Sequence, residues 1–296
     1  RAWDPSSVVF VSFSVFFAMI MADAGYALVL GGLLLVLWGR LGRSPDRRRL
    51  RHLSLAIVVT SVAYGVAVGS YFGLPPAEGS WLQTLHLIDA ANTTLMMQIS
   101  IGLGVAHLAL ANVALAWNRR RSPQMFASLG WVAMLLGGLA LGFGKSGMEP
   151  QADLVRLGTT GLITGVISVL VFSSERTLFS LRLSNHLWRL LDGLQALTGI
   201  SRAFGDVLSY LRLFALGLAS AQLAATFNEL TYKASCCVGV GSALAVVAVV
   251  FGHGLNFTLA IMSGVVHGLR LNCIEFFGWG LPDEGYPFEP FCKKAI

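Results

Sequence analysis

The chain has 296 residues, of which 55% are hydrophobic and only 12% are charged, against roughly 25% charged residues in soluble domains. Its mean hydropathy is +0.69. These values exclude a soluble enzyme, a disordered protein and a collagen-like fibre. They indicate an all-α, polytopic membrane protein, because only helices and closed barrels satisfy backbone hydrogen bonds in lipid. Apolar stretches of about 18 residues or more, without strand-like alternation, argue against a barrel.

The net charge of +6 does not indicate a nucleic-acid partner, because the basic residues lie in short loops between apolar stretches. The four cysteines have no metal-ligand spacing, and two of them are adjacent. The sequence also lacks a nucleotide-binding loop, a nucleophile elbow and paired carboxylates. We therefore expect no catalytic residue, no metal site and no cofactor.

Eight apolar segments are predicted to cross the membrane. The first two are short and separated only by residues 22–25, which predicts a tight helical hairpin. The last segment, of about 40 residues, exceeds the ~30 Å hydrocarbon core, and we expect two long, tilted C-terminal helices. The predicted segments are residues 8–22, 25–39, 53–72, 94–117, 126–143, 157–172, 204–227 and 238–277.

Basic residues alternate between the two ends of these segments. The loops 40–52, 118–124 and 174–202 hold thirteen arginines, whereas the other loops hold three basic residues, Lys145, Arg156 and Lys233. Cytoplasmic loops carry the excess of Lys and Arg, so we expect both chain ends in the cytoplasm and an even number of spans. The first apolar run leads straight into a second one, which is not how a signal peptide ends. We expect part of the parent protein to lie upstream of Arg1.

The connection 174–202 is too long for a simple turn. Its leucines recur at helical spacing, and four polar residues share the opposite face, which predicts an amphipathic helix at the membrane surface. A helix packed on another subunit explains the pattern equally well. The leucines are Leu183, Leu187, Leu190, Leu194 and Leu197, and the polar residues are Arg182, Asn185, Arg189 and Asp192.

Two arginines in the last two segments, Arg212 and Arg270, are the candidate functional residues. An arginine in the middle of a bilayer costs from ~3 to over 10 kcal/mol, so it normally faces protein or water and serves a function. Arg212 is expected eight residues inside its span. The residues around Arg212 have small side chains, Ser209 among them, which allows another helix to approach this one closely. A buried structural ion pair, or snorkelling near an interface, is the alternative for both arginines.

Polar residues also follow one face of the final segment. His253, Asn256, Ser263, His267 and Arg270 form a stripe some 25 Å long at 1.5 Å per residue. A stripe of five favours a water-filled path over isolated core residues. Gln222 and Asn228 of the preceding segment are candidates to extend that path. Glu275 could hold ions at its cytoplasmic mouth or pair with a loop arginine.

The chain resembles a known family at this point. Residues 204–219, with Ser-Tyr-Leu-Arg-Leu at 209–213, closely resemble the signature of the membrane domain of subunit a, called subunit I in bacteria and archaea, of rotary V/A-type ATPases. Three further blocks agree: residues 16–26 with the first hairpin of the family, 267–271 with its last span and 287–291 with its C-terminal tail. The likeness runs in order along essentially the whole chain.

The resemblance implies a stator subunit, not an enzyme by itself, beside a rotating ring of proteolipids with membrane-buried carboxylates. Two offset half-channels carry H⁺ or Na⁺, and the arginine matching Arg212 separates them, with the match of Arg270 nearby. Together, the resemblance and the polar residues described above give the predicted site for ion translocation, which comprises Arg212, Arg270, His267, Ser209, Gln222, Asn256, Ser263 and Glu275.

The resemblance also implies the setting of the chain. Residues 1–296 form a single transmembrane domain, without the N-terminal cytoplasmic domain that grips the peripheral stalks. The implied partners are the ring, the peripheral stalks, the central-stalk cap subunits and the bilayer. The sequence Phe-Ala-Leu-Gly-Leu-Ala that follows Arg212 resembles bacterial members and favours a bacterial plasma membrane. Eukaryotic relatives carry His and Glu where this chain has Ser220 and Ala260, which puts their half-channel assignments in doubt here.

Two other functions fit parts of the pattern. A secondary transporter or ion channel also uses ionisable residues at mid-membrane, but it usually shows repeated halves and broken helices, and no segment here contains a proline. A scaffold without transport would leave the polar stripe unexplained.

Overall fold

The structure, a computed structural model, describes residues 3–90, 92–146, 151–174, 176, 183–235 and 240–281. These residues form helices joined by turns and one longer connection, and the predicted all-α class is confirmed. The helices are α1 Ser6–Met21, α2 Ala24–Leu41, α3 Pro45–Val68, η1 Gln83–Leu85, α4 Thr93–Asn118, α5 Gln124–Ser146, α6 Ala152–Phe172, α7 Leu183–Leu197, α8 Gly199–Ser209, α9 Leu211–Ser235, α10 Gly241–Arg270, the π-helix η2 Leu271–Phe276 and α11 Phe277–Gly280.

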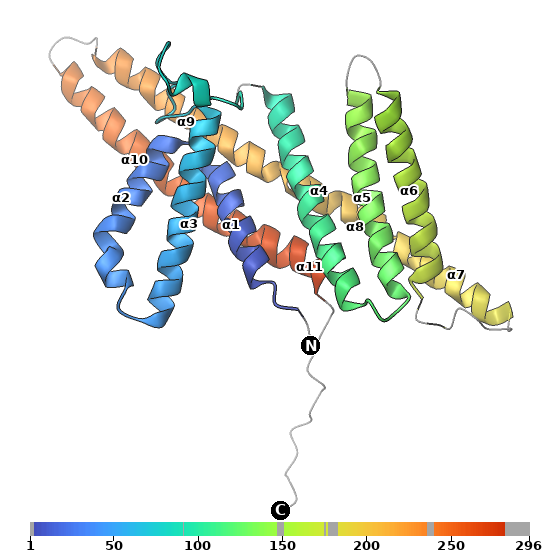
Figure 1. Cartoon of the computed structure of the whole chain (residues 1–296). Helices are drawn as coiled ribbons and strands as arrows, with labels where there is room; N and C mark the ends of the chain where they lie inside the picture. Colours follow the sequence, from blue (N-terminus) through green and yellow to red (C-terminus); the bar gives the residue numbers. More distant parts are fainter. Residues whose placement is uncertain are drawn as a thin grey trace, which may run out of the picture.

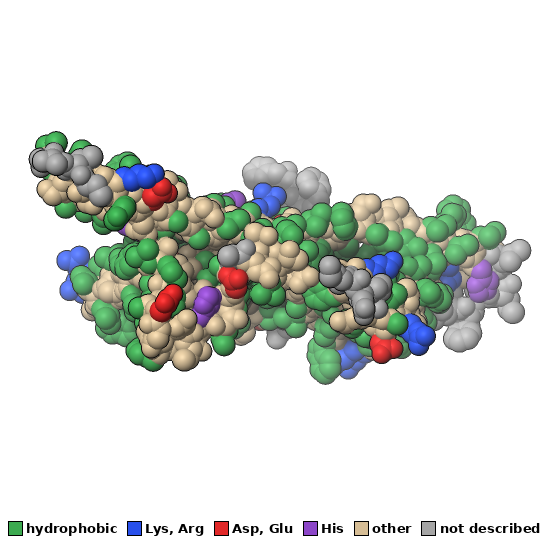
Figure 2. Space-filling view, turned by 90° about the horizontal axis from the view of Figure 1, so that it is seen from above, with side chains coloured by type: hydrophobic (Ala, Val, Ile, Leu, Met, Phe, Trp, Pro, Cys, Tyr) green, Lys and Arg blue, Asp and Glu red, His purple; other side chains and the backbone are tan. Residues whose placement is uncertain are grey.

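Many large hydrophobic side chains of the long helices are exposed, as a lipid-facing surface requires. Seen from above, hydrophobic side chains are spread over the whole length of the molecule among backbone and polar groups (Figure 2). Within the described residues, seven helical segments are long and apolar enough to cross a membrane, and α1 is a shorter apolar helix. The protein is a multi-pass membrane protein, and the number of eight spans stays a prediction. The three Arg-rich turns lie at one end of the molecule together with the chain's N-terminal end (Figure 1).

The helices α9 and α10 run obliquely across the others and pack along each other (Figure 1). The short helix α1 is largely enclosed, because α3, α9 and α10 all pack against it. The main core gathers around it from five helices. Its members include Phe16, Met19, Ile20, Leu108, Tyr210, Leu213 and Leu271.

Residues 22–25 form a tight turn as predicted, but the packing of the predicted hairpin is wrong. The chain turns at Ala22, whose φ is +47°, and α2 begins at Ala24. The helices α1 and α2 then both pack against α3, which lies between them (Figure 1). The reason is Gly65 of α3: a Cβ there would lie 2.3 Å from the Ala24 nitrogen, so only glycine lets α3 approach the turn.

Asp23 joins this turn to the end of α3. Its carboxylate is buried and accepts four hydrogen bonds of 2.6–3.0 Å. The donors are the N–H groups of Tyr26, Phe72 and Gly73 and the hydroxyl of Ser70. A buried carboxylate is stable only with such compensation, so Asp23 caps α2 and ties three segments together.

Glycine pairs allow α5 and α6 to pack closely over their whole length. A Cβ on Gly158 would lie 2.6 Å from the Leu141 nitrogen, and one on Gly165 would lie 2.6 Å from the Gly130 oxygen. Backbones that approach this closely gain van der Waals contact, which drives helix association in lipid.

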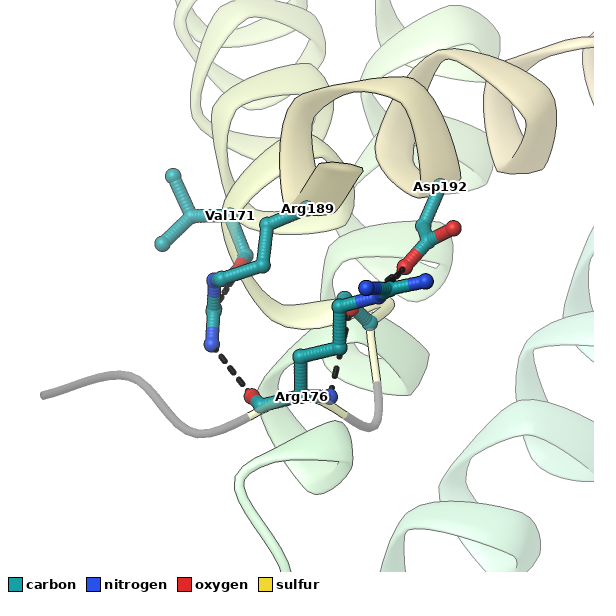
Figure 3. A network of polar contacts seen from close by, with 5 residues as sticks. Val171, Arg176, Arg189 and Asp192 are labelled. Carbon is teal, nitrogen blue, oxygen red and sulfur yellow. Dashed lines mark hydrogen bonds and ion pairs between the residues drawn. The ribbon is translucent and has the colours of Figure 1, made fainter. Parts of the chain in front are cut away.

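The predicted surface helix exists as α7, but Arg189 is not on its open polar face. The Arg189 side chain is only 7% exposed, and its guanidinium donates to the carbonyl oxygens of Val171 at 2.5 Å and Arg176 at 2.6 Å (Figure 3). It thereby satisfies a free carbonyl at the end of α6. Asp192 adds an ion pair with Arg176 at 3.4 Å, and Arg182 lies outside the described residues.

The apolar face of α7 stays open. Leu187, Leu190 and Leu194 are about half exposed. This face is available to lipid or to another subunit, so both sequence-based interpretations of the helix stand.

The hydrogen bonds of Asp23 predict a large loss of stability on substitution. Asp23→Ala leaves four donors without their acceptor, and we expect the free energy of unfolding in micelles to fall by about 3 kcal/mol or more. Asp23→Asn should also destabilise, because its amide N–H₂ would face a donor. The control is Asp46→Ala, since Asp46 is exposed; an equal effect of both alanine variants would contradict the role assigned to Asp23.

Candidate functional site

The predicted seventh segment, 204–227, contains a local irregularity. Helix α8 ends at Ser209, and α9 begins at Leu211, with Tyr210 between them. Arg212 is the second residue of α9, but Tyr210 keeps helical dihedral angles (φ −73°, ψ −17°), so residues 184–235 still form one helical stretch with a local irregularity at Tyr210. The N–H of Leu213 donates to the Tyr210 carbonyl at 3.0 Å, three residues earlier, which tightens the helical turn that contains Arg212.

Tyr210 lies at this irregularity and fills the space between α1 and α4. It is fully buried, and its hydroxyl shares a 2.7 Å hydrogen bond with Nδ1 of His107. The His107 ring stacks on Phe276 with centroids 4.4 Å apart, and Phe16 meets Tyr210 edge to face. A Cβ on Gly104 would lie 2.6 Å from the Tyr210 ring, so glycine makes room for it.

Arg212 carries a charge without a partner of its own. One guanidinium nitrogen, Nη1, is buried and has no hydrogen-bond partner among the described residues. No ion pair of Arg212 occurs within this part of the chain either. A buried donor left unpaired costs free energy, so such a group calls for water or for a partner beyond the described residues.

Arg270 differs, because it has a carboxylate in its own segment. After Arg270 the helix widens into the π-helix η2. Nε of Arg270 lies 4.0 Å from Oε1 of Glu275, and Glu275 is only 2% exposed. The π-helix sets this geometry: an extra residue in the turn brings position 275 back under position 270, and such bulges are frequent at functional sites. Glu275 therefore pairs with an arginine five residues earlier, not with the loop arginine considered from the sequence.

The structure brings five of the predicted site residues together. The His267 ring interacts electrostatically with Arg212 and Arg270, and its Nδ1 is buried without a hydrogen bond among the described residues. The Ser209 hydroxyl lies beside the Glu275 carboxylate, which also interacts with Arg212. The group therefore combines two guanidinium ions, one carboxylate and one imidazole, with net positive charge.

Asn256 belongs to a second, closed cluster. Its side chain is 1% exposed, and its amide donates to the Tyr26 hydroxyl at 3.1 Å and the Ser220 carbonyl at 2.9 Å. His253 bonds the same Tyr26 hydroxyl at 2.7 Å and the Asn228 side chain at 3.0 Å. In this structure the polar groups in this half of the predicted stripe pair with protein, and they join α2, α9 and α10.

Gln222 lies elsewhere, along a cavity of about 510 Å³. Helix α9 forms one wall from Leu213 to Ala225, and the ends of α1, α3 and α4 form the rest with the connection between α3 and α4. Tyr64 lines the cavity and has a buried hydroxyl without a hydrogen bond among the described residues, and His86 lies in the connecting segment. The cavity reaches Leu213, the residue next to Arg212.

Ser263 lies between these groups along α10 and is partly buried. Sequence reasoning missed Tyr210 and His107 as partners, although Tyr210 stands inside the quoted motif. His107 is a single histidine in an apolar helix, and nothing in its spacing reveals a partner 103 residues away. The described residues contain no cluster of three or more His, Cys, Asp or Glu that could hold a metal ion.

Comparison with known proteins identifies relatives over nearly the whole chain. The family model described as V-type ATPase 116kDa subunit family matches residues 202–293. The chain is 30% identical to V-type ATP synthase subunit I 1 of Treponema pallidum over 98% of its length, covering 48% of that protein. It is 30% identical to V-type ATP synthase subunit I of Borreliella burgdorferi, over 98% of this chain and 49% of that protein.

An archaeal relative shows the same coverage. The chain is 29% identical to A-type ATP synthase subunit I of Pyrococcus horikoshii over 98% of its own length and 43% of that protein. The chain thus spans about half the length of the curated relatives that it matches.

The fit of Tyr210 against α4 predicts a position-specific effect. Gly104→Ala puts a methyl group where the Tyr210 ring lies, and we expect it to lower the free energy of unfolding by about 1–3 kcal/mol through overpacking. Gly102→Ala is the matched control, because nothing lies within 4 Å of a Cβ there. Chemical denaturation of both variants in the same micelles measures the difference. Equal stability of the two would show that Tyr210 is not held by this contact.

Proposed function

The chain belongs to the family of subunit a, or subunit I, of V- and A-type ATPases, and on that premise we propose that it is the stator that carries ions past a proteolipid ring. In this proposal Arg212 faces the ring carboxylates, and two half-channels lead to it from opposite sides of the membrane. The family membership itself supports a subunit of a rotary complex.

The unpartnered charge of Arg212 carries this proposal. The described part of the chain offers one carboxylate near two guanidinium ions, and that carboxylate, Glu275, pairs with Arg270. Arg212 keeps a buried donor without a partner. A second protein that presents a carboxylate at the right depth would supply what is missing.

A fixed positive charge suits this task. A guanidinium does not lose its proton at accessible pH. A ring carboxyl alone in lipid keeps its proton, because desolvation disfavours the charged form. At ~4 Å from Arg212 the attraction is about 4 kcal/mol at an effective dielectric of 20, enough to release the proton or bound ion as each site arrives.

Two separate polar regions support two offset paths. The cavity beside Gln222 gives a route from the connection between α3 and α4 to Leu213. Ser263, His267 and Glu275 line a possible second route on the side where the Arg-rich turns lie. Between these two regions, the side-chain amide of Asn256 is hydrogen-bonded to protein groups. This pairing disfavours a continuous chain of water molecules along α10.

Coupling follows from this separation. Because Arg212 blocks direct passage between the two paths, an ion crosses the membrane only by travelling with the ring. The membrane potential supplies about 2.3 kcal/mol per 100 mV for each charge that crosses. We propose the proteolipid ring, the peripheral and central stalk subunits and the bilayer as partners, with H⁺ or Na⁺ as the ion. We further propose a bacterial plasma membrane, with both chain ends in the cytoplasm.

The alternative of a secondary transporter is less well supported. Such a protein needs a complete substrate site within its own chain. Here Glu275 is already paired with Arg270, and the residues around Arg212 leave its charge uncompensated.

Arg212→Ala should abolish ion transport that is coupled to ATP hydrolysis while the complex still assembles, because the residue acts on the ring carboxylates. Arg212→Lys should retain only a small part of the activity, since a desolvated lysine can lose its charge. Ion uptake into reconstituted vesicles measures both variants. Near wild-type uptake by either one would contradict the proposal; Arg121→Lys, at an exposed residue of the turn between α4 and α5, is the control.

The two paths predict a pattern of cysteine reactivity. Gln222→Cys should react with impermeant thiol reagents added from outside, and Ser263→Cys and His267→Cys with small reagents from the cytoplasmic side. Asn256→Cys should stay protected within its cluster. Leu255→Cys and Leu259→Cys, on the open apolar side of α10, are the controls and should also stay unreactive. Equal labelling of all six positions, or of none, would contradict the two-path arrangement.

A further inference from the structure

The turn between α2 and α3 concentrates positive charge more than any other segment of the chain. Residues 40–51 hold six arginines and one acidic residue, Asp46. Asp46 faces Arg49 at 3.9 Å, and the other five arginines have no ion pair in the described part of the chain. The preference for basic residues on the cytoplasmic side accounts for the number of charges but not for their arrangement.

Two of these arginines converge on Gly42 at the end of α2. Nε of Arg48 donates to the Gly42 carbonyl at 2.9 Å, and a Cβ on Gly42 would lie 3.3 Å from Nη1 of Arg51. The Arg51 guanidinium also lies over the Trp38 ring, 4.5 Å from its centroid. Stacking on an aromatic ring fixes the orientation of its remaining donors.

Arg51 also has a donor without a partner. Its Nε is buried and makes no hydrogen bond within the described residues. Two guanidinium groups side by side repel each other, and an unpaired N–H costs free energy, so both features call for an anion.

The neighbouring surface is apolar. On α2, Leu35 and Val36 are 72% and 81% exposed, and Leu37 is partly exposed as well. These residues directly precede Trp38 and the arginines, and the turn lies at the end of the molecule where the chain's N-terminal end also lies (Figure 1). A ligand that fits both parts has an anionic head and hydrocarbon tails.

We infer that Arg48 and Arg51 at Gly42 form a binding site for the phosphate of an anionic phospholipid. The phosphodiester accepts hydrogen bonds from both guanidinium groups, and the acyl chains lie along Leu35–Leu37. Trp38 lies at the boundary between head and tails, where aromatic residues are enriched. A free phosphate would use the arginines but not the apolar surface, so we assign the site to the lipid. This site is independent of the proposed ion path.

The test uses the purified full chain, stripped of lipid in neutral detergent and titrated with phosphatidylglycerol. Native mass spectrometry counts the bound lipid, with phosphatidylcholine as the neutral comparison. Arg48→Gln with Arg51→Gln should weaken phosphatidylglycerol binding about thirtyfold, two charges at the membrane surface each contributing. Arg48→Lys with Arg51→Lys keeps the charges that set topology and should lose part of the affinity, because lysine cannot bind the phosphate with two parallel bonds.

Arg119→Gln with Arg121→Gln is the matched control, because it removes two charges from another turn at the same end of the molecule and should leave binding unchanged. The inference is overturned if this control weakens binding as much as the Gln pair, or if wild-type chain binds both lipids equally. It is also overturned if inorganic phosphate at millimolar concentration displaces the lipid completely. If the Gln pair fails to fold, unchanged affinity of the folded Lys pair overturns it as well.

Discussion

Arg212 and Arg270 lie close to a single carboxylate, that of Glu275, in a part of the molecule where an unbalanced charge is costly. In the π-helix after α10, Oε1 of Glu275 lies 4.0 Å from Arg270, whereas Oε2 of Glu275 and Nη1 of Arg212 are both buried without a hydrogen bond among the described residues. Within the described residues the charge of Arg212 is not compensated, so water or a further carboxylate has to meet it. It gives a physical reason for a site that is completed only when a second protein presents a carboxylate.

The scaffold keeps that imbalance in place. Tyr210 separates α8 from α9 and is itself fixed by His107 on α4 and by the stacked ring of Phe276, which belongs to the same π-helix as Glu275. One set of ring contacts therefore positions both the start of α9, where Arg212 lies, and the turn that presents Glu275. Near the middle of α9, a Cβ on Gly73 would lie 2.5 Å from Cβ of Ala224, so the connection held by Asp23 also fits closely against this helix.

Polar groups within the apolar helices serve two different purposes in this molecule. Tyr26, His253 and Asn256 bond one another and leave little capacity for water, which makes them links between helices. His267, Tyr64 and Arg212 each retain a buried polar atom without a partner among the described residues. Unsatisfied groups of this kind are expensive unless water or a ligand meets them, so they mark the regions where an ion path is most reasonable.

The helical membrane class, the approximate segments and the Arg-rich turns follow from the sequence alone, because hydropathy and loop charge are local properties, and the Ser-Tyr-Leu-Arg-Leu motif singled out Arg212 as a candidate. The sequence could not determine the tightened turn at Tyr210 or the hydrogen bond between Tyr210 and His107, since the latter joins residues far apart in the sequence. The division of the polar stripe into a paired half and an unpaired half is likewise decided by the tertiary structure. Periodicity puts Asn256 and His267 on one face of α10, but the neighbours of that face differ along its length: Tyr26 and Ser220 satisfy Asn256, whereas Arg212 and Arg270 face His267. The burial of Arg189 has the same origin, because the carbonyl groups at the end of α6 that it satisfies come into reach only when the chain folds back.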